Sequence, residues 1–182
     1  MSPKTPIQLS QLPSSWNCAC CGKSHSGLPL DYGEEFPQYY LGWSEGLSDE
    51  EIKKRCFVNS DICVVDDKHY FVRGVIEIPI IGFQETFNWG VWVSASKRSF
   101  DEIIELWDKD PSGYGPYFGW LDSALNLYSP PTYGLKTNIH LRGGNLRPRI
   151  ELQATEHPLA VEQRSGITIE RVQEIAAALL HN

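Results

Sequence analysis

The sequence predicts an α+β protein in which an antiparallel sheet of about five strands carries helices packed on one side. Apolar and polar residues alternate with period two along several stretches, which is typical of half-buried antiparallel strands. These stretches follow one another directly, and segments with apolar residues at helical spacing lie between and after them. At 182 residues, of which 41% are hydrophobic, the chain is long enough to bury a core without disulfides.

The N-terminal third is predicted to be mostly irregular. Residues 1–15 are rich in Pro, Ser and Gln, so we expect a flexible arm there and a single domain over residues 16–182 that opens with a Cys knuckle. Turn residues are closely spaced over residues 28–40, which favours an extended, partly covered loop. A capping box between Ser48 and Glu51 then predicts a short helix over residues 49–56.

Two strand regions follow in the middle of the chain. Residues 62–65 and 69–79, joined by a short turn, indicate a β-hairpin, and residues 87–95 continue the alternation as a third strand. Within that strand Trp92 points away from the predicted buried face. It must therefore be covered by another segment or form an interface.

The C-terminal half combines two helices with a further hairpin. A second capping box, Ser99 with Glu102, predicts a helix over residues 100–109. Residues 110–134 are dense in Gly, Pro and Tyr, and the element type there stays open. Alternation over residues 135–154 around a Gly-Gly-Asn turn predicts a hairpin, and an apolar stripe after Gly166 predicts a terminal helix that packs on the sheet.

The charge is negative and unevenly distributed. The chain has 16 Lys and Arg against 23 Asp and Glu, a net charge of −7, and residues 31–110 alone carry 17 acids and 8 bases. Such a chain repels phosphate backbones unless it has a dense basic stripe, so we expect no nucleic-acid partner. No apolar run approaches the ~18 residues of a membrane span, and the N-terminus lacks an apolar secretory segment, so we expect no membrane partner and a cytoplasmic location.

The five cysteines point to metal chemistry rather than disulfides. Their number is odd, and three of them crowd into residues 18–21. Cys18 and Cys21 are separated by two residues and followed by glycine, a spacing that lets both thiolates face one ion. His25 lies just beyond and can supply a third ligand, while Cys63 or His157 can supply the fourth. We therefore predict a structural Zn²⁺ site with Cys18, Cys21, His25 and Cys63.

Other interpretations of these thiols remain. The cysteines can be reduced and without a role, since isolated pairs occur by chance and Cys20 next to Cys21 blurs the motif. A thioredoxin-type redox pair is disfavoured because such a pair opens a helix, whereas Gly22, Gly27 and Pro29 prevent one here.

Two other patterns were weighed as catalytic motifs. Residues 42–46 match the nucleophile elbow Gly-x-Ser-x-Gly around Ser44, but an elbow needs a strand before the serine and a helix starting on it, so a chance match is the better interpretation. His157 precedes a proline just after the last predicted strand. It is interpreted first as a hydrogen-bonded corner residue.

Several motifs taken together resemble the bacterial domain of unknown function 2199 family, over nearly the whole chain from Cys18. The motifs are Cys18-x-x-Cys21-Gly22-x-x-His25, Asp61-x-Cys63-Val64-x-Asp66, Phe71-x-Arg73-Gly74, Trp89-Gly90-Val91-Trp92-Val93-Ser94, Gly119-Trp120-Leu121 and His157-Pro158-Leu159-Ala160. The resemblance implies a bacterial single-domain protein, and the family pattern includes the positions of Cys18, Cys21, His25, Cys63 and His157. It supplies no catalytic residues.

These observations favour a non-enzymatic binding or interaction module, stapled by zinc, with an acidic and aromatic surface that contacts a protein partner. The chain shows no complete catalytic constellation. The alternative is a small metal- or thiol-dependent hydrolase that uses the knuckle with His157. A further hypothesis, resting on the net charge of −7 alone, is that the chain neutralises a basic protein such as a nuclease toxin.

Overall fold

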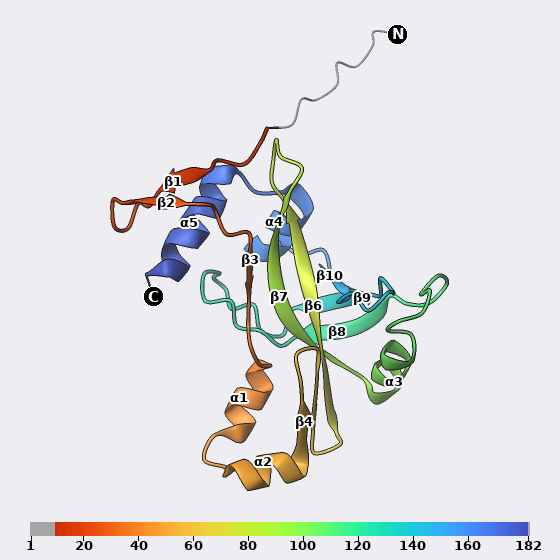
Figure 1. Ribbon diagram of the computed structural model, residues 1–182. Coiled ribbons are helices and arrows are strands. Elements are labelled where there is room, and N and C mark those ends of the chain that lie inside the picture. Colours follow the sequence, from red (N-terminus) through yellow and green to blue (C-terminus); the bar gives the residue numbers. More distant parts are fainter. Residues whose placement is uncertain (1–9, 182) are drawn as a thin grey trace, which may run out of the picture.

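A computed structural model describes residues 10–181 and shows a mixed fold of ten strands and five helices within that range (Figure 1). The strands are β1 (Ser15–Asn17), β2 (Ser24–Ser26), β3 (Asp31–Gly33), β4 (Cys56–Val58), β5 (Ile62–Val65), β6 (His69–Pro79), β7 (Thr86–Ala95), β8 (Tyr117–Leu121), β9 (Lys136–His140) and β10 (Arg149–Leu152). The helices are α1 (Gln38–Ser44), α2 (Asp49–Arg55), α3 (Lys97–Glu105), α4 (Pro158–Ser165) and α5 (Ile169–Leu180).

The main sheet closes on itself as a five-stranded barrel, in the order β6-β7-β8-β9-β10 and back to β6. Four of the five junctions are antiparallel. The fifth, between β10 and β6, is parallel and pairs Arg149 with Val75. Because an odd number of strands cannot close with antiparallel pairs alone, one parallel junction is required. The predicted mixture of helices and strands is confirmed, but the open antiparallel sheet with helices on one side is wrong.

The long β6–β7 hairpin allows both closure and extension of the sheet. Its strands have 11 and 10 residues, longer than any other strand described. The first half of β6 pairs with β5 and a later residue pairs with β10, while the first half of β7 pairs with β3 and its end pairs with β8. Each hairpin strand therefore changes neighbour along its length. The strands β3, β5 and β4 extend the barrel as outer arms.

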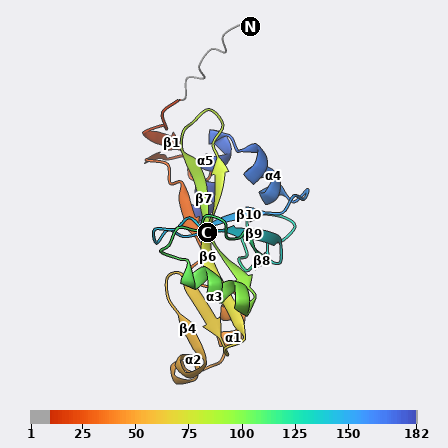
Figure 2. The same ribbon diagram turned by 90° about the vertical axis from the view of Figure 1, so that its right-hand side faces the viewer.

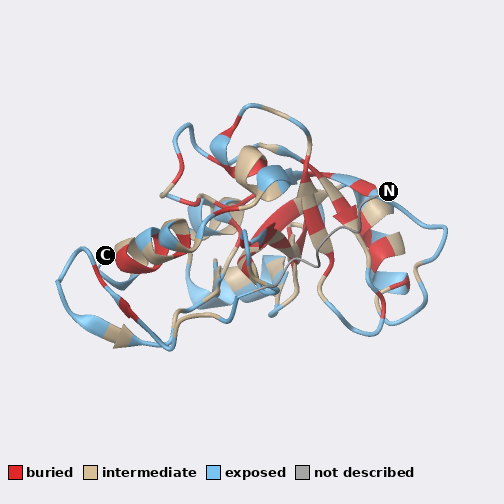
Figure 3. Ribbon diagram, turned by 90° about the horizontal axis from the view of Figure 1, so that it is seen from above, coloured by how far each residue is buried: buried red, intermediate tan, exposed pale blue. Residues whose placement is uncertain are grey.

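The alternation predicted for these strands matches their burial. Val72, Ile76 and Ile78 on β6 and Val91 and Val93 on β7 are fully buried in the main core. Figure 3 shows buried residues concentrated on the strands and on one side of the helices. The period-two pattern therefore identified the core-facing residues correctly.

The helices lie at different places around the sheet. In Figures 1 and 2, α1 and α2 lie at one end of the β6–β7 hairpin, whereas α5 and the β1–β2 hairpin lie at the other end. Trp92 points away from the main core but is fully buried in a separate core cluster with Cys63, Val65 and Phe71. Side chains of α1, including Tyr39 and Trp43, cover this cluster from outside.

Several element boundaries differ from the sequence prediction. The loop expected over residues 28–40 contains β3 and the start of α1. The helix predicted over residues 100–109 spans Lys97–Glu105, because Ser96 rather than Ser99 is its N-cap and accepts the Ser99 amide. Helix α4 was not predicted.

The N-terminal arm predicted over residues 1–15 falls largely outside the described residues. At its end Ser10 bridges Phe83, and Ser15 begins β1. The single domain over residues 16–182 stays a prediction.

Candidate metal centre

A short hairpin near the N-terminus positions three of the candidate ligands. β1 and β2 pair antiparallel with Trp16 opposite His25. Cys18 follows β1 directly, Cys21 lies in the connecting turn, and His25 is the middle residue of β2. The turn closes through the Gly22 amide, which donates to the Cys18 carbonyl at 2.9 Å. Gly22 has φ +68°, a left-handed conformation that glycine adopts without steric cost.

Helix α5 brings a fourth candidate ligand, His181, which is its C-cap residue. Its inner side packs Ala176 and Ala177 against Trp16 and Cys18, and these small side chains let the helix approach the hairpin closely. The His181 Nε2 atom lies 3.2 Å from the Cys18 Sγ atom. The helix and the hairpin therefore meet at a set of side chains that come from opposite ends of the described chain.

The four side chains converge with distances suited to a tetrahedral ion. One ligand atom from each of Cys18, Cys21, His25 and His181 lies within 4.8 Å of the other three. Cys21 Sγ and His25 Nε2 are 3.4 Å apart. A tetrahedral zinc ion with bonds of about 2.3 Å to sulfur and about 2.0–2.1 Å to nitrogen separates its ligand atoms by roughly 3.3–3.8 Å. The observed spacing is close to this geometry, so the residues present fit a metal ion.

The electrostatic environment favours a thiolate at Cys18. Burial opposes ionisation of this thiol, which is 2% exposed. Hydrogen bonds from the Cys21 and Cys20 amides, with smaller contributions from the His181 and Cys21 side chains, outweigh burial and lower its pKa from 9.0 to about 6. Thiolate is the form that binds metal. The knuckle backbone therefore stabilises the charge that a metal ligand needs.

The imidazoles of the cluster are held by aromatic neighbours. The His25 ring stacks on Trp16 with centroids 5.1 Å apart, and the His181 ring lies edge-on to His25 at 6.3 Å. Trp16 is 3% exposed and donates its Nε1 hydrogen to the Gly27 carbonyl at 2.9 Å. This hydrogen bond fixes the orientation of the indole on which the His25 ring stacks.

The structure brings together Cys18, Cys21 and His25 but does not bring Cys63 to them. Cys63 is fully buried in the cluster beneath α1, where its Sγ lies 4.0 Å from that of Cys56. Burial raises the pKa of the Cys63 thiol, which keeps it protonated at neutral pH. Cys63 pairs with Phe71 of β6, so strand pairing fixes the position of Cys63 within the sheet. The prediction of Cys63 as a ligand does not fit this structure.

No motif in the sequence links His181 to the knuckle. The spacing between His181 and the knuckle carries no information about their distance in space. The only local signal is a histidine at the end of a helix whose inner side contains consecutive small residues.

The two candidate catalytic residues have structural roles. His157 is the N-cap of α4, and its Nδ1 accepts the Leu159 amide at 3.2 Å while its Nε2 lies 2.9 Å from the Pro130 carbonyl. Ser44 is the last residue of α1 and donates its hydroxyl hydrogen to the Leu41 carbonyl at 3.2 Å. It follows a helix rather than a strand, so the nucleophile elbow is absent at this serine.

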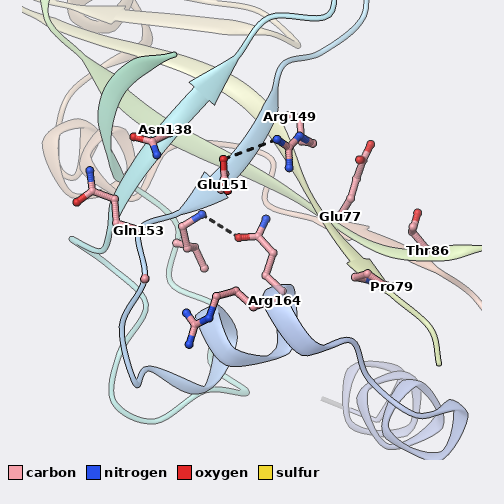
Figure 4. Close-up of a pocket in the computed structure, with 11 residues that line it drawn as sticks. Glu77, Pro79, Thr86, Asn138, Arg149, Glu151, Gln153 and Arg164 are labelled. Carbon is pink, nitrogen blue, oxygen red and sulfur yellow. Dashed lines mark hydrogen bonds and ion pairs between the residues drawn. The ribbon is translucent and has the colours of Figure 1, made fainter. Parts of the chain in front are cut away.

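A polar cavity of about 490 Å³ lies between β6, β9, β10 and α4 (Figure 4). Its charged groups already have partners: Arg149 lies 3.7 Å from Glu151, and Arg142 donates to Glu77 at 2.7 Å. The Gln163 amide clamps β10 by accepting the Leu152 amide and donating to the Ile150 carbonyl. Gln163 therefore holds α4 against β10 of the barrel.

Fold and site together define a small mixed α/β protein, built on a five-stranded barrel, with a Cys₂His₂ cluster that can bind a metal. The chain belongs to the bacterial family described as "uncharacterized protein conserved in bacteria (DUF2199)", whose model matches residues 17–167. This range contains Cys18, Cys21 and His25 but ends before His181. No curated protein and no solved structure matches the chain. None of the helices within residues 10–181 has the length and apolarity needed to cross a membrane.

Proposed function

We propose that the protein is a non-enzymatic binding module whose N-terminal hairpin is fixed to its C-terminal helix by a structural zinc ion. The observation that carries the proposal is the convergence of Cys18, Cys21, His25 and His181 within 4.8 Å. Two thiolates and two imidazoles in a tetrahedral arrangement form a donor set that suits Zn²⁺. The strands of this hairpin have only three residues each, so the hairpin makes a small apolar interface with α5. The ion supplies the stability that a larger apolar interface would otherwise provide.

The closed ligand set favours this module over a metal-dependent hydrolase. A catalytic zinc ion keeps one coordination position open for water or substrate, whereas four protein ligands fill a tetrahedral site. His157, the residue assigned to the hydrolase alternative, already hydrogen-bonds to Leu159 and Pro130.

We also propose a cytoplasmic location and a protein partner. All five cysteines are free thiols, which supports a reducing compartment. The net charge of −9 over residues 31–110, which include α1 and α2, supports a partner with a basic surface. Association of that kind weakens as ionic strength rises.

Metal analysis of the purified chain tests the zinc proposal. We expect about one equivalent of zinc per chain in protein purified without added metal. Cys18→Ser and His181→Ala should each lose most of it, because each removes one of four ligands. The matched control is Cys20→Ser, which removes an exposed thiol of the same knuckle that lies outside the cluster and should retain the metal.

Replacement of zinc by Co²⁺ provides a second measurement, which does not depend on how much zinc is retained during purification. Tetrahedral coordination with two thiolates gives intense visible absorption, whereas a site with five or six ligands gives a weaker spectrum. Zinc below about a tenth of an equivalent, together with no thiolate–cobalt absorption, would overturn the proposal. Equal metal content in wild type and His181→Ala would exclude His181 as a ligand.

A further inference from the structure

A cavity of about 330 Å³ opens between α1, β6, β8 and the loop that follows β8. Five aromatic side chains line it: Tyr39, His69, Phe71, Trp120 and Tyr133. Asp122, the first residue after β8, supplies a carboxylate to the same cavity. The volume falls within the range of small-molecule sites, which is about 300–1,000 Å³.

The charge of Asp122 has no cationic partner among residues 10–181. Asp122 is 5% exposed, and its Oδ1 atom accepts the Tyr39 amide at 2.7 Å. The residues that line the cavity include neither Lys nor Arg, and Asp122 takes part in none of the ion pairs described. His69 also lines the cavity, where its ring packs against the Tyr39 ring with centroids 4.4 Å apart. Burial raises the pKa of Asp122 despite the amides of Tyr39 and Gln38. A buried carboxylate without a counter-ion favours a ligand that brings a positive charge.

The aromatic rings at the entrance are accessible. Trp120 is 45% exposed and Tyr133 is 52% exposed, whereas Phe71 is buried at the base. Burial and the charge of Asp122 raise the pKa of the Tyr133 hydroxyl, which agrees with its position facing that carboxylate. The Lys136 ammonium lies 5.7 Å from the Trp120 ring centroid, so a cation already contacts this indole. Exposed aromatic faces beside a carboxylate form the environment that organic cations prefer.

We propose that this cavity binds a small organic ammonium ion, with its charge facing Asp122 and its alkyl or aryl groups against Tyr39, Trp120 and Tyr133. The proposal rests on the chemistry of this cavity and is independent of the metal centre. The rival explanation gives Asp122 a structural role only, as the acceptor that holds the start of α1. In that case the cavity takes uncharged apolar molecules at least as well as cations.

Calorimetric titration of the full chain with matched pairs of ligands separates the two explanations. One pair is choline and its neutral carbon analogue, in which a tert-butyl group replaces trimethylammonium. The other is benzylammonium and benzyl alcohol. We expect saturable binding of at least one cation with a Kd of about 1 mM or below, and at least tenfold weaker binding of its neutral partner.

Three variants locate the binding. Asp122→Asn keeps a carbonyl acceptor for the Tyr39 amide, removes the charge, and should weaken cation binding at least about tenfold. Trp120→Ala should weaken it through loss of the ring, and this exposed position does not endanger the fold. The matched control is Phe57→Ala on β4, whose ring is 57% exposed and does not line the cavity. It should bind like wild type.

Each result decides for or against the proposal. Selective cation binding that is lost in Trp120→Ala and Asp122→Asn but kept in Phe57→Ala supports it. Equal binding of cation and neutral analogue overturns it in favour of an uncharged apolar site. Absence of saturation with both cations at concentrations up to about 10 mM also overturns it.

Discussion

Asp122 links two elements that lie far apart in sequence. Its carbonyl accepts the Gln38 amide at 2.9 Å, and its carboxylate accepts the Tyr39 amide at 2.7 Å. Helix α1 begins after Pro37, which has no side chain able to cap it. Asp122 therefore satisfies two of the free amides at the start of that helix. Burial raises the pKa of the same carboxylate, which gives it a measurable effect on stability.

Replacement of Asp122 by Asn should change how stability depends on pH. Burial raises the folded-state pKa of Asp122 above its ordinary value of 3.8, so between these two values the folded state holds more protons than the unfolded state. The free energy of unfolding contributed by this group is therefore present below pH 4 and falls as the pH rises through the folded pKa. Asn does not ionise, so the variant does not show this fall in the free energy of unfolding.

Urea unfolding of wild type and Asp122→Asn between pH 3.5 and pH 7 measures this effect at about half-unit steps. All other groups titrate in both proteins, so the difference in unfolding free energy isolates Asp122. That difference should move in favour of the variant as the pH rises. A difference that stays constant with pH would contradict a raised pKa.

At the scale of single residues, prediction succeeded where local geometry restricts a side chain to few positions. The alternation of the β7 strand predicted that Trp92 is either covered by another segment or part of an interface, and it is covered by Tyr39 and Trp43 of α1. The two-residue spacing of Cys18 and Cys21 likewise predicted that they share a site. The fourth member of the Cys/His cluster could not be predicted, because only the packing of α5 on the hairpin brings His181 there.

At the scale of elements, the capping box of α2 shows how local chemistry fixes a helix start. Ser48 is the N-cap and accepts the Glu51 amide, while the Glu51 carboxylate accepts the Ser48 amide at 2.9 Å. Three acids occupy the first turn and three bases the last, which complements the helix dipole. These interactions are local in sequence, so both the existence and the start of α2 were predicted correctly.

Ser48→Ala should lower the free energy of unfolding by about 0.5–2 kcal/mol, because it leaves the Glu51 amide without its acceptor. The matched control is Ser44→Ala, which removes a hydroxyl from the end of α1 and should change stability by no more than about 0.5 kcal/mol. Urea unfolding followed by circular dichroism measures both. Equal effects of the two substitutions would show that the Ser48 cap does not contribute to the free energy of unfolding.

Helix α1 shows why other elements could not be predicted locally. Its sequence contains a glycine and three aromatic residues, and its N-cap Pro37 makes no side-chain cap. Its stability comes from packing on Phe71 and Trp92 and from the amide contacts with Asp122. The Trp43 indole also donates to Asp66, which pairs with Arg55 at 2.7 Å. All these partners lie outside the helix.

At the scale of the molecule, barrel closure depends on geometry that single strands do not encode. The sequence predicted most barrel strands and the antiparallel pairing of β9 with β10. It left β8 undefined, and it gave no indication that β10 returns beside β6 through a single parallel pair. Gly74 allows this contact, because a Cβ there would lie 2.5 Å from the Ile150 side chain. Closure thus rests on a small residue facing a large one across strands distant in sequence.

The closed barrel and the metal centre should behave as separate stabilising units. The barrel strands are joined by a continuous ladder and a large core, whereas β1 and β2 have three residues each and form a separate two-stranded sheet. An isolated hairpin of that size is marginal in water. Bound metal adds stability only to the conformation in which the hairpin and α5 meet.

Hydrogen exchange measured with zinc and after chelation should therefore change locally. We expect faster exchange after chelation in residues 15–26 and at the C-terminal end of α5, because both lose the ion that joins them. The strands β6 to β9 should keep their protection, since their hydrogen bonds do not involve the hairpin. Cys20→Ser, with all four ligands intact, should respond like wild type. Loss of protection throughout the barrel would show instead that the metal supports the entire fold.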